Sequence, residues 1–145
     1  MACSGQPAGT GDDFAARAKQ VCQTALESKQ GWTAFPVPNF DPAAPDPSAF
    51  PQVATWLEDQ VAPTFGSWLD GLKALGDPPS DQKDWSEVLA AVAKIKSGNA
   101  DEIAAAKAGD VDGFVAAHDR LENTQSDLED STANAGVPSC ADVHA

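Results

Sequence analysis

Four stretches of this chain repeat apolar residues at steps of three and four, the spacing of one buried face on an α-helix. They lie at residues 14–26, 50–75, 85–95 and 111–132 of the 145-residue sequence. No run alternates apolar and polar residues with the β-branched density that a strand needs. Four amphipathic helices joined mostly by short links pack most simply as a bundle, in which each helix contacts its neighbours. We therefore predict an all-α fold, a four-helix up-down-up-down bundle.

A long connection should separate the first two helices. Residues 32–51 contain six prolines, and proline fixes the backbone dihedral and removes a hydrogen-bond donor. A connection of this length without its own structure is either functional or packed against the body of the protein. We expect an extended Pro-rich loop between helices one and two.

Four features should mark breaks or starts in the later helices. Pro63 should kink or split the second helix, because a proline inside a helix removes a backbone hydrogen bond. Asp84 with Glu87 forms a capping-box pattern at the start of the third helix. We expect residues 97–99, Ser-Gly-Asn, to weaken that helix, and Asp110 to cap the start of the last one.

Large aromatic side chains carry much of the apolar volume. Three of them lie in the Pro-rich connection and three tryptophans lie at helical spacing: Trp32, Phe35, Phe40, Trp56, Trp68 and Trp85. The loop aromatics either cover one end of the bundle or form a binding lip. The helical tryptophans either belong to the core or line a cleft for a small ligand. We keep all six as a possible ligand or partner surface.

The cysteines are odd in number: Cys3, Cys22 and Cys140. In an exported protein this count favours one disulfide and one thiol with a separate role. Cys22 lies on the first predicted helix and Cys140 follows the last one, so a bond between them would tie the C-terminal tail to helix one. Two buried free thiols are the alternative.

The formal net charge of −13 restricts the possible partners. Nucleic-acid binding needs clustered Lys and Arg, and no such cluster occurs, so we exclude it. Anionic lipid headgroups would also be repelled. The acidity either maintains solubility or selects a basic partner. No apolar run is long enough to span a bilayer.

The sequence offers little for catalysis or for a metal. Its histidines are His118 and His144, the second in a tail that we expect to be mobile. His118 and Glu122 are four residues apart and share one helix face, but two ligands do not make a metal site. Residues 110–113, together with Asp119, resemble part of a calcium loop, but a helix cap at Asp110 is the interpretation that we favour. We predict no enzyme, cofactor or metal site.

The N-terminal segment suggests an anchor. Ala2-Cys3-Ser4-Gly5 is followed by small, flexible residues and resembles the start of a mature bacterial lipoprotein, in which the cysteine carries a diacylglyceryl group. We expect an export signal to have preceded this segment, with Met1 an added start. We assign residues 1–11 to a flexible tether and residues 12–145 to a single helical domain.

The chain as a whole resembles the small secreted lipoproteins of actinobacteria. Beyond the Cys3 segment, the likeness rests on the early helix from Phe14 to Cys22, on Ala108-Gly109-Asp110 before the last helix, and on Gly136-Val137-Pro138-Ser139-Cys140. It implies export and anchoring of Cys3 to the outer face of the cell membrane, and it carries over no catalytic residue.

Three functional hypotheses follow from these features. The first is a non-catalytic, lipid-anchored interaction module that contacts the membrane only through its anchor and binds a protein partner. The second is a carrier of a small apolar ligand in a cavity among the bundle aromatics. A metal-binding or enzymatic bundle is the third and weakest. A cavity of several hundred Å³ would favour the carrier.

Overall fold

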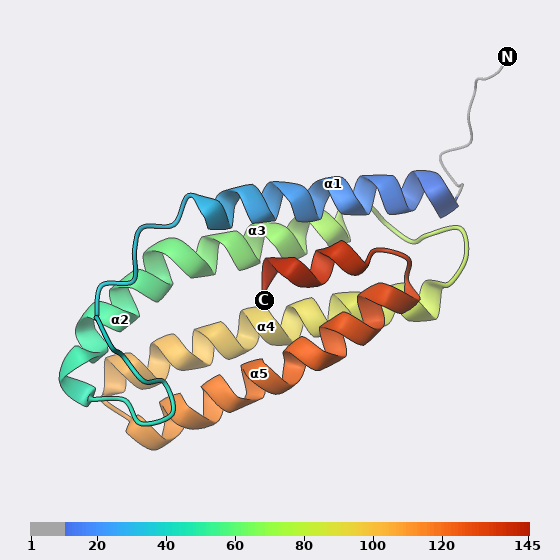
Figure 1. The fold of residues 1–145 in the computed structure, drawn as a ribbon. Helices are drawn as coiled ribbons and strands as arrows, with labels where there is room; N and C mark the ends of the chain where they lie inside the picture. The colour runs from blue at the N-terminus through green and yellow to red at the C-terminus, as the bar shows by residue number, and fades with distance from the viewer. Residues whose placement is uncertain (1–10) are drawn as a thin grey trace, which may run out of the picture.

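The computed structural model describes residues 11–145, with side chains from Asp13 onward. Every regular element in this range is helical, which confirms the all-α prediction (Figure 1). The expected lipidation site Cys3 and the tether up to residue 10 lie outside the described residues.

Five α-helices form the body of the described chain, together with three short helical segments. The helices are α1 (Gly11–Gln30), α2 (Phe50–Trp56), α3 (Ala62–Lys73), α4 (Gln82–Ala108) and α5 (Val111–Asn134). The short segments are the 3₁₀ turn η1 (Pro47–Ala49), the π turn η2 (Leu57–Val61) and the 3₁₀ helix η3 (Pro138–Val143). Helices α4 and α5 lie side by side, α1 lies along α3, and η3 packs against both α1 and α5 (Figure 1).

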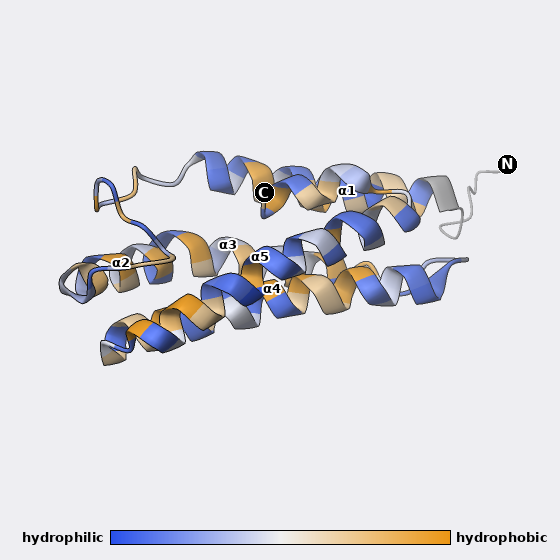
Figure 2. Cartoon of the chain, turned by 60° about the horizontal axis from the view of Figure 1, so that its bottom comes forward, coloured by the Kyte–Doolittle hydropathy of each residue, from blue (hydrophilic) through white to orange (hydrophobic). Residues whose placement is uncertain are grey.

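Each long helix carries both polar and apolar residues, as amphipathic patterns require (Figure 2). The apolar faces meet in one core, whose largest fully buried side chains include Trp68, Phe50, Phe114 and Leu72. Within residues 11–145 no helix combines the length and apolar composition needed to cross a bilayer. Residues 31–46, between α1 and η1, adopt no regular structure.

The break predicted at Pro63 is present. Helix α2 passes into the π turn at Leu57–Val61, and α3 then begins with Pro63 in its first turn. Proline is tolerated there because the first backbone N–H groups of a helix lack an intrahelical partner. The π turn therefore separates α2 from α3 just before the residue that would interrupt a continuous α-helix.

The weakening predicted at residues 97–99 is wrong, because α4 runs unbroken through them. A Cβ atom added at Gly98 would lie 2.7 Å from Cδ2 of Leu121 on α5. Gly98 thus allows α4 and α5 to approach closely, and their packing stabilises a helix that local propensity alone would weaken.

The predicted caps have different outcomes. Helix α4 begins at Gln82, after Asp81 in the left-handed conformation with φ of 57°, so Asp84 lies in the first turn and is not the cap. The Asp110 prediction is confirmed, because its side chain accepts a hydrogen bond of 2.9 Å from the Gly113 N–H at the start of α5.

The predicted disulfide between Cys22 and Cys140 is confirmed. It joins the middle of α1 to η3 across a sequence separation of 118 residues. Both cysteines are buried, and the Trp68 indole N–H on α3 lies 3.4 Å from Cys22 Sγ. The bond fixes the C-terminal segment against the bundle and so determines where the last residues lie.

Candidate functional site

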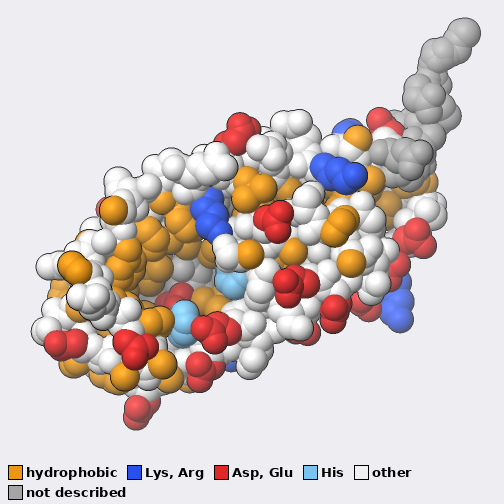
Figure 3. All heavy atoms as spheres, viewed as in Figure 1, with side chains coloured by type: hydrophobic (Ala, Val, Ile, Leu, Met, Phe, Trp, Pro, Cys, Tyr) orange, Lys and Arg blue, Asp and Glu red, His pale blue; other side chains and the backbone are white. Residues whose placement is uncertain are grey.

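A cavity of about 480 Å³ opens between the 31–46 loop, the α2–α3 segment, α4, α5 and the C-terminal segment. Figure 3 shows it as a deep hollow with hydrophobic walls and with histidine and acidic side chains at one side. Its apolar lining consists of Trp32, Phe35, Phe40, Pro42, Val53, Leu57, Val61, Phe65, Phe114 and Leu121, and its polar lining of Lys29, Asn99, Glu102, His118, Glu122 and His144.

The 31–46 loop forms one wall of the cavity and is fixed to the α2–α3 segment. The Trp32 indole N–H donates to Thr64 Oγ1 at 3.0 Å, and the Thr33 N–H donates to Gln60 Oε1 at 3.1 Å. These bonds place the Trp32 ring edge-on to Phe65, with centroids 6.2 Å apart. The loop is therefore held in a defined position although it has no regular structure.

Further along the loop, two phenylalanines continue the aromatic wall toward α5. The ring of Phe35 lies 5.5 Å from that of Phe40, which in turn meets the buried Phe114 edge-on at 5.8 Å. Phe35 is 38% exposed, an unusual exposure for so large an apolar side chain. These rings give the cavity a nearly continuous aromatic surface on the loop side.

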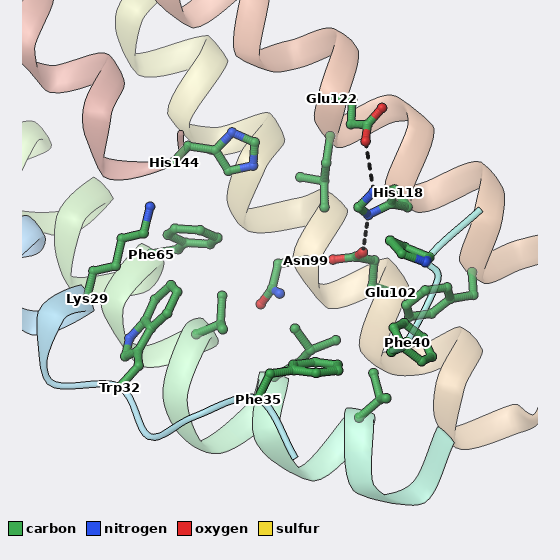
Figure 4. Close-up of a pocket in the computed structure, with 16 residues that line it drawn as sticks. Lys29, Trp32, Phe35, Phe40, Phe65, Asn99, Glu102, His118, Glu122 and His144 are labelled. Carbon is green, nitrogen blue, oxygen red and sulfur yellow. Dashed lines mark hydrogen bonds and ion pairs between the residues drawn. The ribbon is translucent and has the colours of Figure 1, made fainter. Parts of the chain in front are cut away.

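The opposite wall, on α4 and α5, carries a buried carboxylate. Glu102 is only 6% exposed, and its Oε2 lies 3.2 Å from Nδ1 of His118. The other ring nitrogen, Nε2, lies 3.0 Å from Oε1 of Glu122. The two hydrogen-bonded contacts fix the imidazole between two carboxylates (Figure 4). Burial raises the pKa of Glu102 above its ordinary value, and the hydrogen bonds and charge of His118 oppose that rise.

Asn99 lies one helical turn before Glu102 and is 2% exposed. Figure 4 shows its carboxamide directed into the cavity, between Glu102 on one side and Lys29 on the other. It makes a side-chain hydrogen bond to Glu102, which lowers the pKa of that carboxyl and so partly offsets the effect of burial. A buried amide with this orientation offers a hydrogen-bonding group to a bound molecule.

The second polar end of the cavity comes from α1 and the C-terminus. Nδ1 of His144 lies 2.7 Å from Oε1 of Gln125, and its ring lies 5.8 Å from that of Phe65. Burial first, and then the charges of Lys29 and His118, lower the pKa of His144 to about 4. The Lys29 ammonium donates to the carbonyl oxygen of Ala145. The expectation of a mobile tail is wrong, because the disulfide and these contacts hold His144 in the cavity wall.

A second hollow, of about 540 Å³, lies on the other side of the loop against Trp56. None of its lining residues is buried, so it has neither a desolvated charge nor a buried polar group to orient a ligand. The cavity that contains Glu102 is therefore the better candidate site.

No family model, curated protein or solved structure matches this chain.

The function must therefore be argued from the cavity itself. Among the described residues there is no cluster of three or more His, Cys, Asp or Glu side chains that could hold a metal ion. The cavity offers instead an aromatic wall, hydrogen-bonding groups and a buried carboxylate. Apolar walls with a few oriented polar groups are typical of small-ligand sites.

The structure divides the six aromatic residues singled out in the sequence. Trp32, Phe35 and Phe40 line the cavity. Trp56 lies behind them, with its ring 5.7 Å from that of Trp32. The remaining two, Trp68 and Trp85, are buried in the core at 1% and 3% exposure and do not reach the cavity.

Sequence reasoning missed most of the polar lining, above all Asn99 and Glu102. A signal was present, because these residues continue the apolar face of residues 85–95 beyond Ile95, at steps of four and three. Polar side chains on an apolar helix face are unusual and indicate a site. In the sequence, however, residues 97–99 favour a weak point in the helix, which draws attention away from the face that Asn99 occupies.

Proposed function

We propose that this protein is a non-catalytic binding protein that holds a small, largely apolar molecule in the Glu102 cavity. The observation that carries the proposal is the cavity itself, about 480 Å³ in volume and lined mainly by apolar side chains. Sites that bury most of a small molecule have volumes of roughly 300–1,000 Å³. Desolvation of such a molecule against the aromatic wall would supply most of the affinity.

A cavity-filling substitution tests this proposal. Val61 is buried in the cavity wall, so Val61→Phe would place a ring in the space that a ligand needs. N-phenylnaphthylamine, a neutral apolar probe whose fluorescence rises in apolar surroundings, should bind the wild type and bind Val61→Phe at least about tenfold more weakly. The matched control is Val115→Phe, on a half-buried position of α5 outside the cavity. Equal binding to all three proteins, or no binding to the wild type, would refute the proposal.

A protein partner is the second candidate, supported by the exposed Phe35 at the cavity mouth. An exposed apolar patch on a protein surface often marks a docking site. The two candidates differ in their response to Phe35→Ser. If the Phe35→Ser variant no longer captures a protein in a pull-down but still binds N-phenylnaphthylamine, a protein partner is favoured. If the variant loses only the binding of N-phenylnaphthylamine, the small ligand is favoured.

We further propose that the protein acts outside the cytoplasm, anchored to the outer face of the cell membrane through a lipid on Cys3. The Cys22–Cys140 disulfide supports an oxidising compartment. Two or three acyl chains would give a stable anchor, whereas one would be marginal. Intact-mass measurement on protein from the native envelope should show the acyl mass at the N-terminus, and an unmodified mass would contradict the anchor.

We also propose the four-helix up-down-up-down arrangement. It treats α2, the π turn and α3 as one bent helix, so that α1, this bent helix, α4 and α5 are the four elements. The short connection at Gly109 and Asp110 supports antiparallel packing of α4 and α5. In this arrangement the cavity lies between the elements near one end of the bundle.

A further inference from the structure

We infer that the molecule bound in the cavity is an organic cation, with a protonated amine or ammonium group that pairs with Glu102 and an apolar body that lies against the aromatic wall. This inference rests on the proposed function, because it names the class of ligand for that same cavity. It is carried by the placement of one buried carboxylate, one buried amide and several aromatic rings around one space.

Glu102 supplies the negative group for such a cation. Its side chain belongs to the cavity lining yet has only 6% of its surface exposed, so any charge on it is poorly solvated. An ionised carboxylate offers about four acceptor positions, and the protein partners described for it are His118 and Asn99. An ammonium group could donate to the remaining positions, and charge-assisted hydrogen bonds of this kind are about twice as strong as neutral ones.

The aromatic wall suits the same ligand. Phe40 lines the same cavity as Glu102 and contacts both Phe35 and Phe114 (Figure 4). The faces of aromatic rings attract cations, an effect that strengthens when water is excluded. An alkyl or aryl body attached to the nitrogen would then extend toward Trp32 and Phe65, at the other end of the wall.

The end of the cavity that carries Lys29 and His144 is poorly suited to bind an anion. The Lys29 ammonium is already engaged by the carbonyl oxygen of Ala145, and the charge of Asp142 also acts on it. His144 is hydrogen-bonded to Gln125, and its lowered pKa keeps it uncharged at neutral pH. The formal charge of −13 on the whole chain also raises the local concentration of cations and lowers that of anions.

A matched series of headgroups tests the inference. Octylammonium, octanol and octanoate share one chain and differ in charge, and each can compete with N-phenylnaphthylamine at neutral pH and physiological ionic strength. We expect octylammonium to displace the probe at a concentration at least about tenfold lower than octanol does. Octanoate should be the weakest of the three.

Two variants test whether the Glu102 carboxylate causes the preference for octylammonium over octanol. Glu102→Gln keeps the shape and removes the charge, so it should bring octylammonium to the level of octanol while the probe itself still binds. Glu129→Gln, an equal change at an exposed position on α5 away from the cavity, should leave the preference intact. Retained probe binding also shows that the Glu102→Gln protein is folded.

The remaining outcomes separate failure of this inference from failure of the proposed function. If octanol displaces the probe as well as octylammonium does, or if octanoate is the strongest competitor, the cationic class is wrong while the cavity remains a ligand site. If Glu102→Gln keeps the full ammonium preference, the assignment to Glu102 is wrong. If the probe does not bind the wild-type cavity, both proposals fail together.

Discussion

The carboxylate of Glu102 on α4 lies 3.2 Å from Nδ1 of His118 on α5, and both side chains line one aromatic cavity. The contact joins the two helices where Gly98 and Leu121 also bring them together. A buried charge is costly unless it has partners. The fold therefore maintains a poorly solvated carboxylate at the wall of a cavity large enough for a small molecule.

Glu102 should make the protein less stable as pH rises. Its pKa is raised above the ordinary 4.5, chiefly by burial. As pH rises through 4.5 toward the folded-state pKa, the folded protein holds a proton that the unfolded chain has released, so the free energy of unfolding falls. Urea denaturation should show wild type losing stability relative to Glu102→Gln over this window. A gain of wild type relative to the variant would contradict the burial argument.

His144 should produce the opposite dependence. Its pKa is lowered from 6.5 to about 4, so between these values the unfolded chain binds a proton that the folded protein does not. The free energy of unfolding should therefore fall as pH falls through this window, by about 3 kcal/mol at roughly 1.36 kcal/mol per pKa unit. His144→Gln should flatten the fall in urea titrations from pH 7 to pH 4. An unchanged slope in the variant would show that His144 is not held in the wall as described.

The disulfide should contribute several kcal/mol. Replacing both Cys22 and Cys140 by Ala opens a loop with a sequence separation of 118 residues. Loop-closure entropy predicts a loss of about 5 kcal/mol, and measured losses for native disulfides are typically about 2–5 kcal/mol. Chemical denaturation of the double variant against wild type measures this loss directly. A change below about 1 kcal/mol would mean that the C-terminal segment is held without the covalent bond.

Gly98 should tolerate no side chain, whereas Gly66 should. A Cβ at Gly98 would lie 2.7 Å from Leu121, while a Cβ at Gly66 on α3 would meet nothing within 4 Å. We expect Gly98→Ala to lose about 1–3 kcal/mol through overpacking. Gly66→Ala should gain up to about 1 kcal/mol through helix propensity. Thermal melts of both variants check the pair, and a stabilising Gly98→Ala would disprove the close approach of α4 and α5.

Much of the fold could be predicted from the sequence, because apolar periodicity, prolines and helix caps act locally and three cysteines leave few possible pairings. The break near Pro63, the cap at Asp110 and the Cys22–Cys140 bond follow from such rules. The continuity of α4 through Gly98 could not be predicted, since it depends on Leu121 from another helix.

The candidate site was predicted only in part, for the same reason. The loop aromatics Trp32, Phe35 and Phe40 stood out as large apolar residues in a segment without a helical face. His144 reaches the cavity only because the disulfide and the contact with Gln125 fix the tail, a tertiary effect without a local signature. The pairing of Glu102 with His118 likewise depends on the α4–α5 register, which no single helix specifies.

Whether the cavity binds an organic cation at Glu102 can be seen directly in a crystal structure of the protein with octylammonium at a concentration well above its measured dissociation constant. We expect electron density for the ligand between Phe35, Phe65 and Asn99, with its nitrogen within hydrogen-bonding distance of Glu102. A ligand-free cavity, or a ligand bound only elsewhere on the surface, would show that this cavity is not the cation site.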